Sequence, residues 1–178
     1  MKQSKNIILT SVIAITLGLA SVTASAADQI YGGIGTGLAI PTGDYSNTLD
    51  DSQAWKVFGG QDINENLSIE GGYTKFGEMD VSNSTTDNDN SVEYTAFQVS
   101  PVAVLPIGNR LSLFIKAGFL AWDSDTEING TDNGVDIFYG AGVDYILSEN
   151  LSVKGTWESY TFDEVEANLY SVSAVFHF

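Results

Sequence analysis

The chain ends with the stretch Tyr170–Phe178, which reads YSVSAVFHF. Successive side chains of a β-strand point to opposite faces, so an extended segment sorts these residues into two sets. One face would carry Tyr170, Val172, Ala174, Phe176 and Phe178, and the other would carry Ser171, Ser173, Val175 and His177. The first face is apolar, whereas the second is smaller and more polar. The pattern predicts a strand with an apolar surround on one side and a wetter interior on the other.

The first 26 residues have the organisation of a secretory signal peptide. Lys2 and Lys5 precede an apolar run over residues 7–20, and the small residues Ala-Ser-Ala at 24–26 provide a cleavage site. A helical membrane anchor is the alternative, but the run is short and no charged stop-transfer segment follows it. We therefore expect a signal peptide over residues 1–26 and a mature domain over residues 27–178.

The composition excludes several classes of protein. Seven Lys and Arg stand against 23 Asp and Glu, a net charge of −16, so nucleic acid is not an expected partner. A hydrophobic content of 43% with 11% aromatic residues argues against disorder. The chain has no cysteine, which excludes a disulfide framework and a thiolate metal site, and we expect no cofactor. After the signal no run approaches the roughly 20 apolar residues of a membrane helix, so any membrane crossing must use strands.

Eight segments with alternating polarity follow the signal, and most are near the length of about 9 to 11 residues that crosses a bilayer at a tilt. They are 30–40, 54–62, 67–76, 92–105, 111–122, 135–147, 151–160 and 167–178. Their connections alternate between short turns at 63–66, 106–110 and 148–150 and mostly longer loops at 41–53, 77–91, 123–134 and 162–166. Short turns on one side and loops on the other predict an all-β fold, an eight-stranded antiparallel up-and-down transmembrane β-barrel.

An internal repeat supports this arrangement of strands. The segment Glu65–Tyr73, ENLSIEGGY, is echoed by Glu149–Trp157, ENLSVKGTW, and more loosely by Asn109–Leu113. With these turns and the terminal Phe178, the chain resembles the OmpA/OmpX-type family of small outer-membrane β-barrels. The resemblance implies an integral protein of the Gram-negative outer membrane, inserted by the barrel assembly machinery, which reads the C-terminal strand with Phe178 as the assembly signal. It does not imply peptidoglycan binding, since the chain stops at the barrel.

The same alternation places several polar side chains in the interior of the barrel. They are Lys56, Glu70, Gln98, Lys116, Asp144, Lys154 and Glu158. Charges in so narrow a space need partners. Two interpretations stay open: an ion-pair plug that rigidifies the barrel, and a charged path for ions or small solutes. Eight strands leave little free bore, which favours the plug.

A glycine-rich stretch at residues 32–37 lacks the spacing and the following helix of a phosphate-binding loop. Its alternate residues Gly33, Gly35 and Gly37, together with Ala39, would point inward. We interpret them as small residues that make room for larger side chains on neighbouring strands.

The four predicted surface loops hold 14 of the 23 acidic residues and no Lys or Arg. A solvated acidic face is one interpretation. The other is binding of divalent cations, which would bridge to lipopolysaccharide phosphates or to a partner. Asp123, Asp125, Glu127 and Asn129 present oxygen atoms at alternate positions as calcium loops do, but Gly130 comes two places too late for an EF-hand and position twelve is Gly134.

Catalysis is not expected. The only histidine, His177, is next to last in the chain and is predicted to point inward near the periplasmic rim. Barrel lipid A deacylases need a His and a Ser at the lipid-facing surface, and acyltransferase-type barrels need a histidine in the external region, where the predicted loops have none. We therefore predict a structural scaffold of the outer membrane that displays acidic loops for envelope integrity, adhesion or surface interaction, with an unknown extracellular ligand. The alternative is a narrow, cation-favouring, porin-like channel lined by the interior charges.

Overall fold

A computed structural model describes residues 30–42, 50–80, 91–126, 130–162 and 165–178, and nearly all of these residues lie in strands. The strands are β1 (Ile30–Thr42), β2 (Ser52–Asn64), β3 (Leu67–Phe76), β4 (Met79–Asp80), β5 (Ser91–Pro106), β6 (Leu111–Thr126), β7 (Gly130–Ser148), β8 (Leu151–Phe162) and β9 (Val165–His177). Over the described ranges no helix has the length and apolar character needed to span a membrane.

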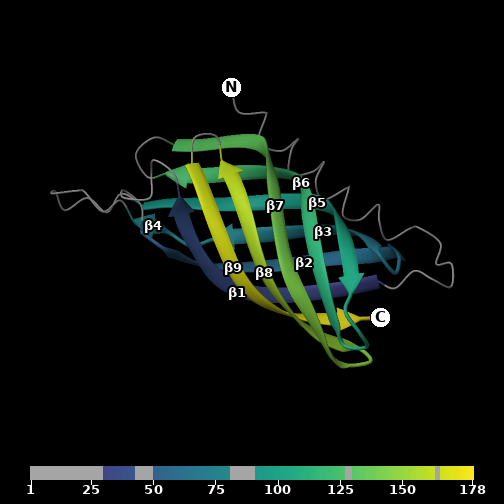
Figure 1. The fold of residues 1–178 in the computed structure, drawn as a ribbon. Coiled ribbons are helices and arrows are strands. Elements are labelled where there is room, and N and C mark those ends of the chain that lie inside the picture. Colours follow the sequence, from purple (N-terminus) through teal and green to yellow (C-terminus); the bar gives the residue numbers. More distant parts are fainter. Residues whose placement is uncertain (1–29, 43–49, 81–90, 127–129, 163–164) are drawn as a thin grey trace.

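The strands close into a single antiparallel barrel (Figure 1). Each long strand pairs with its neighbours in sequence, β9 pairs with β1, and β3 pairs with β5. The two-residue β4 pairs with the first residues of β5, beyond the end of β3, and is no separate member of the barrel wall. The predicted eight-stranded up-and-down barrel is therefore confirmed. Closure pairs all of the main strands along most of their length and so leaves few unsatisfied backbone groups facing lipid.

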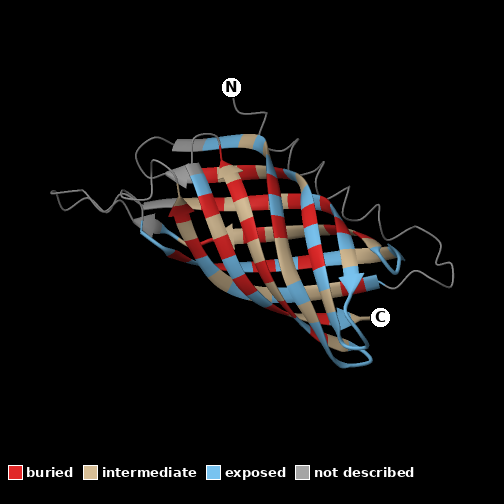
Figure 2. Cartoon of the chain, in the orientation of Figure 1, coloured by how far each residue is buried: buried red, intermediate tan, exposed pale blue. Residues whose placement is uncertain are grey.

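Burial alternates along every strand of the barrel, as the bands of colour in Figure 2 show. In β9 the side chains of Tyr170 and Val172 are 51% and 61% exposed, whereas Ser171 and Ser173 are buried. Large apolar side chains such as Ile115 and Phe119 point outward and are exposed on β6. An apolar exterior around a partly polar interior is the arrangement of a barrel that sits in lipid.

Small residues of β1 make room for large side chains inside the barrel. A Cβ atom added to Gly33 would overlap the ring of Phe58 on β2, and one added to Gly35 would overlap the Ser173 side chain on β9. The same relation holds between Gly142 and the ring of Phe114. The interpretation of the glycine-rich stretch as strand packing agrees with these contacts.

The strands are longer than predicted at one end of the barrel. The predicted loop 123–134 is the clearest correction, because β6 continues to Thr126 and β7 begins at Gly130, with pairs that run from Trp122↔Gly134 to Thr126↔Gly130. The polar sequence suggested a loop. Outside the lipid, however, two strands can pair through backbone hydrogen bonds without apolar side chains on their outer face.

The barrel has a turn end and a loop end. The turn end carries the connections at 65–66, 107–110 and 149–150 and the last residue, Phe178, whose N–H donates to the carbonyl of Ile30 at 2.9 Å. The loop end carries the connections that follow β1, β3, β6 and β8.

Candidate functional site

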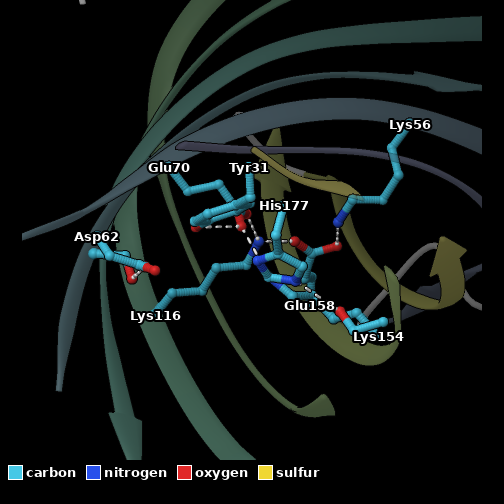
Figure 3. Close-up of polar contacts among 10 residues, drawn as sticks. Tyr31, Lys56, Asp62, Glu70, Lys116, Lys154, Glu158 and His177 are labelled. Carbon is cyan, nitrogen blue, oxygen red and sulfur yellow. Dashed lines mark hydrogen bonds and ion pairs between the residues drawn. The ribbon is translucent and has the colours of Figure 1, made fainter. Parts of the chain in front are cut away.

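A chain of ion pairs crosses the barrel interior, and we call it the charged belt: Lys56, Glu70, Lys116, Lys154 and Glu158 (Figure 3). Lys116 on β6 is its centre. Its Nζ lies 2.8 Å from Oε1 of Glu70 on β3 and 2.5 Å from Oε1 of Glu158 on β8. The Lys116 side chain is 2% exposed and that of Glu158 is 0% exposed. One lysine thus forms ion pairs with two buried carboxylates from different parts of the wall.

The belt continues to both sides of Lys116. Lys56 Nζ on β2 lies 2.5 Å from Oε2 of Glu158, and Lys154 Nζ on β8 lies 3.2 Å from Oε2 of Glu70. The hydroxyl of Tyr31 also donates to Oε2 of Glu70, at 3.2 Å. Each charge has an opposite charge within hydrogen-bond distance, which compensates the cost of removing it from water.

Aromatic rings of the interior surround the belt on one side. The Nζ of Lys154 lies 5.0 Å from the ring centroid of Tyr31, 5.1 Å from that of Phe58 and 4.9 Å from that of Phe114. Cations are attracted to aromatic faces within about 6 Å. These three residues were not singled out from the sequence, although each lies two positions from an inward residue already named, Gly33, Lys56 or Lys116. The alternation of inward and outward side chains along these strands could therefore have identified them.

Two polar residues predicted for the interior stand outside the chain of ion pairs. Gln98 is buried and accepts a hydrogen bond from the hydroxyl of Tyr160 at 2.8 Å. Asp144 lies on β7 opposite Lys154 in the pairing of β7 with β8, but no hydrogen bond reaches its buried Oδ1 atom. The structure thus brings five of the seven residues into one network.

An aromatic layer fills the interior between the belt and the loop end. It consists of Phe76, Tyr94, Trp122, Phe138, Tyr160 and Phe162, all buried. Phe162 is central: its ring centroid lies 5.2 Å from that of Phe76 and 4.8 Å from that of Tyr94. The indole N–H of Trp122 donates to Oδ2 of Asp136 at 2.8 Å, which satisfies its polar atom.

The turn end holds a cavity of about 220 Å³ instead of packed rings. Tyr31, Asp62, Asp144, Lys154 and His177 are among the residues that line it. The Nε2 atom of His177 lies 3.1 Å from the hydroxyl oxygen of Ser152. The side chain of His177 therefore lies on the inner face of the rim.

The candidate cation loop is not assembled as one loop by the described residues. Asp123 and Asp125 lie in β6, while Glu127 and Asn129 fall outside the described residues. Throughout the described part of the chain, no group of three or more His, Cys, Asp or Glu side chains is placed to hold a metal ion. Phe178, the predicted assembly signal, is 83% exposed on the outer face of the turn end.

A closed strand barrel with an apolar exterior and a paired, charged interior defines an integral membrane β-barrel. The sequence matches the family described as outer membrane protein beta-barrel domain over residues 12–178, and the chain belongs to that family. It is accordingly an integral protein of the outer membrane. A search among curated protein sequences finds no significant match.

Several solved structures share the fold. Ail, the attachment invasion locus protein of Yersinia pestis, in complex with the heparin analogue sucrose octasulfate, is 16% identical, with a TM-score of 0.64 over 85% of this chain and 99% of that one. Neisserial surface protein A is 12% identical, with a TM-score of 0.66 over 84% and 97%. The N-terminal β-barrel domain of Pseudomonas aeruginosa OprF is 12% identical, with a TM-score of 0.60 over 85% and 97%. At these identities the likeness concerns the fold alone.

Proposed function

We propose that this protein is a non-conducting structural scaffold of the Gram-negative outer membrane that presents its loop end to the outside of the cell. The observation that carries the proposal is the double filling of the interior, by the charged belt and by the aromatic layer. An eight-stranded barrel is only just wide enough for its side chains, so two filled layers in series leave no room for a continuous water column.

The channel remains the second candidate because of the cavity at the turn end. Asp62 and Asp144 line this cavity and would favour cations there. The belt beyond it has the opposite bias, since Lys56, Lys116 and Lys154 outnumber Glu70 and Glu158. A cation that entered the cavity would therefore meet a net positive constriction, which argues against a cation-favouring pore.

The surface role belongs to the loop end. The sequence concentrates acidic residues in and beside its connections, so the surface is suited to repelling polyanions or to holding divalent cations between itself and lipopolysaccharide phosphates. Ail was crystallised with a heparin analogue, which is a polyanion. With a net charge of −16, this chain is expected not to bind sucrose octasulfate unless calcium is present. Adhesion, surface interaction and envelope integrity are the roles that such a surface supports.

The remaining parts of the proposal concern biogenesis and chemistry. The signal peptide is removed before Ala27, and the barrel assembly machinery reads the last strand with its exposed Phe178. We propose no catalysis: the Ser152 hydroxyl lies 3.1 Å from Nε2 of His177, as a nucleophile lies beside a base, but Ser152 is fully buried inside the turn end and not at the lipid-facing surface.

Planar-bilayer recordings on refolded residues 27–178, with and without millimolar calcium, test the scaffold against the channel. We expect silence in both conditions. Steady openings would contradict the scaffold, and their reversal potential in a salt gradient would give the ion preference. Folding is verified independently by the shift in gel mobility between heated and unheated samples, so that silence does not come from an unfolded chain.

A further inference from the structure

The cavity at the turn end is large enough for a small molecule. Its volume is about 220 Å³. A cavity of roughly 150 Å³ holds a molecule of the size of benzene, so this one has room for a ligand somewhat larger than that. Lys154 of the charged belt lines the cavity, and so do Ser148 and Glu149, which are exposed at the end of β7 and in the turn that follows. A ligand therefore enters from the turn end.

The walls of the cavity are predominantly acidic. Besides Tyr31, the ionisable residues that line it are Asp62, Asp144, Glu149, Lys154 and His177. The Nζ atom of Lys154 lies 3.2 Å from Oε2 of Glu70, so the belt already compensates this positive charge. The field that remains in the cavity is that of the three carboxylates, which attracts a cation and repels an anion.

One carboxylate has an oxygen atom that lacks a donor. Oδ1 of Asp144 is buried, and no hydrogen bond reaches it. In Asp62, by contrast, Oδ1 accepts a hydrogen bond from the Ser68 hydroxyl at 2.6 Å. A buried polar atom without a partner destabilises a protein, so a ligand that donates to Oδ1 of Asp144 supplies an interaction that the chain itself does not make.

The positions of Asp62 and Asp144 determine the shape of a cation that uses both. Asp62 lies on β2 and Asp144 on β7, and the same number of strand pairings separates them along β2–β1–β9–β8–β7 and along β2–β3–β5–β6–β7. The two carboxylates therefore belong to opposite walls. In agreement with this separation, no three His, Cys, Asp or Glu side chains of the described ranges are placed to hold a metal ion. A cation that reaches both walls must carry its charges at the two ends of a chain.

The strands between these two walls present apolar side chains to the cavity. Val102 on β5, Phe114 on β6 and Val175 on β9 line it, and all three are buried. Methylene groups that pack against these side chains leave water, which favours binding. The ring of Phe114 also presents an aromatic face, which attracts ammonium groups.

We propose that the turn-end cavity binds a short aliphatic diammonium ion. One ammonium group donates to Oδ1 of Asp144, the other pairs with Asp62, and the methylene chain packs against Val102, Phe114 and Val175. Glu149 at the rim attracts the ion toward the cavity. The proposal goes beyond the scaffold role and does not depend on it, because the cavity lies on the turn-end side of the belt whether or not the barrel conducts.

The test uses refolded residues 27–178 in nanodiscs of phosphatidylcholine, which carries no net charge and so does not concentrate the ligand. Putrescine is the probe, and carbon NMR follows the side-chain carboxyl groups of Asp62 and Asp144. Both signals should shift with one saturable dependence on putrescine concentration. The carboxyl signal of Asp136, which accepts a hydrogen bond from Trp122 in the aromatic layer, should not move. Butylamine should bind at least tenfold more weakly than putrescine, and butanediol should shift neither signal.

A pair of variants separates this site from general attraction by an acidic protein. Asp144→Asn keeps the shape of the side chain and removes its charge, and should weaken putrescine binding at least tenfold. Glu65→Gln is the matched control, because Glu65 is exposed in the turn between β2 and β3 at the same end of the barrel, and it should bind within twofold of the wild type. Should Asp144→Asn fail to fold, the comparison of the three ligands on the wild type decides.

Three results would overturn the proposal: no saturable shift of the two carboxyl signals, as expected of a cavity that holds only water and bulk ions; equal binding of butylamine and putrescine; or equal losses in Asp144→Asn and Glu65→Gln. Failure of the scaffold is a separate outcome. A barrel that conducts ions yet binds putrescine with these preferences would refute the closed interior and leave the cavity site standing.

Discussion

Around Phe162 the interior of the barrel is filled by packed aromatic rings, whereas around Lys116 it is filled by paired charges. Both regions arise from the same inward positions of the same strands; Trp122 and Lys116, for example, share a face of β6. Aromatic rings fill space without needing exact partners. Buried charges need a specific opposite charge, so removing one partner leaves the other uncompensated. The two regions should therefore respond differently to substitution, although both close the barrel.

The largest expected effect is at the centre of the charged belt. Lys116→Met should lower the free energy of unfolding by about 3–5 kcal/mol, because Glu70 and Glu158 each lose a buried partner. Urea titration of the refolded protein in lipid vesicles measures the change. Lys75→Met is the matched control, since Lys75 pairs with Glu93 at 3.0 Å in a half-exposed position where solvent screens the charges, and it should change the free energy of unfolding far less than Lys116→Met does.

A compensating change tests whether the belt acts through paired charge. Glu158→Gln alone should leave the buried Lys56 ammonium without its ion-pair partner, and adding Lys56→Met should restore part of the lost stability, because the unpaired charge is then removed. If the two substitutions simply add, the belt does not act as a paired network.

In the aromatic layer we expect a loss of similar or somewhat smaller size. Phe162→Ala should cost about 3–5 kcal/mol, because the site is packed between Phe76, Tyr94 and Tyr160 and cannot collapse fully. Phe162→Leu should recover most of this, since the layer needs volume rather than a defined partner. A leucine variant as unstable as the alanine variant would argue that ring geometry, and not filling, holds this region together.

A smaller effect is expected in the wall of the charged region. Gly33→Ala should cost about 1–3 kcal/mol, because the added methyl group overlaps the ring of Phe58, which contacts Lys154. Gly59→Ala is the control, because the nearest atom to an added Cβ there is 3.5 Å away. Equal stability of the two variants would show that the Phe58 ring is free to move.

The sequence was sufficient for the features that depend on strand parity. The alternation of polar and apolar residues predicts the number of main strands and the small inward residues of β1. It also predicts the inward positions of the charged belt, Lys56, Glu70, Lys116, Lys154 and Glu158. Alternation along a strand predicts which face of the sheet a side chain occupies, but not which residue of another strand it contacts. The pairing of Lys56 with Glu158 joins β2 to β8, across the barrel, and depends on closure and on the pairing of every strand between them.

Two other features could not be predicted from the sequence, each for a different reason. Alternation along β7 correctly predicts that Asp144 faces the interior. It does not predict that Asp144 lies at the cavity, where its Oδ1 atom makes no hydrogen bond, because that depends on how far along the barrel axis the residue lies. The extension of β6 and β7 was missed because their acidic, glycine-containing ends have the composition of a loop. There the backbone ladder holds the hairpin without an apolar face.

The most direct test of the closed interior is hydrogen exchange of the lysine ammonium groups, followed by NMR in lipid nanodiscs. Lys56 and Lys116, buried in the belt, should keep their ammonium protons long enough to be observed, whereas half-exposed Lys75 should exchange too fast to be seen. Exchange at Lys116 as fast as at Lys75 would mean that water reaches the belt, and would contradict the closed barrel.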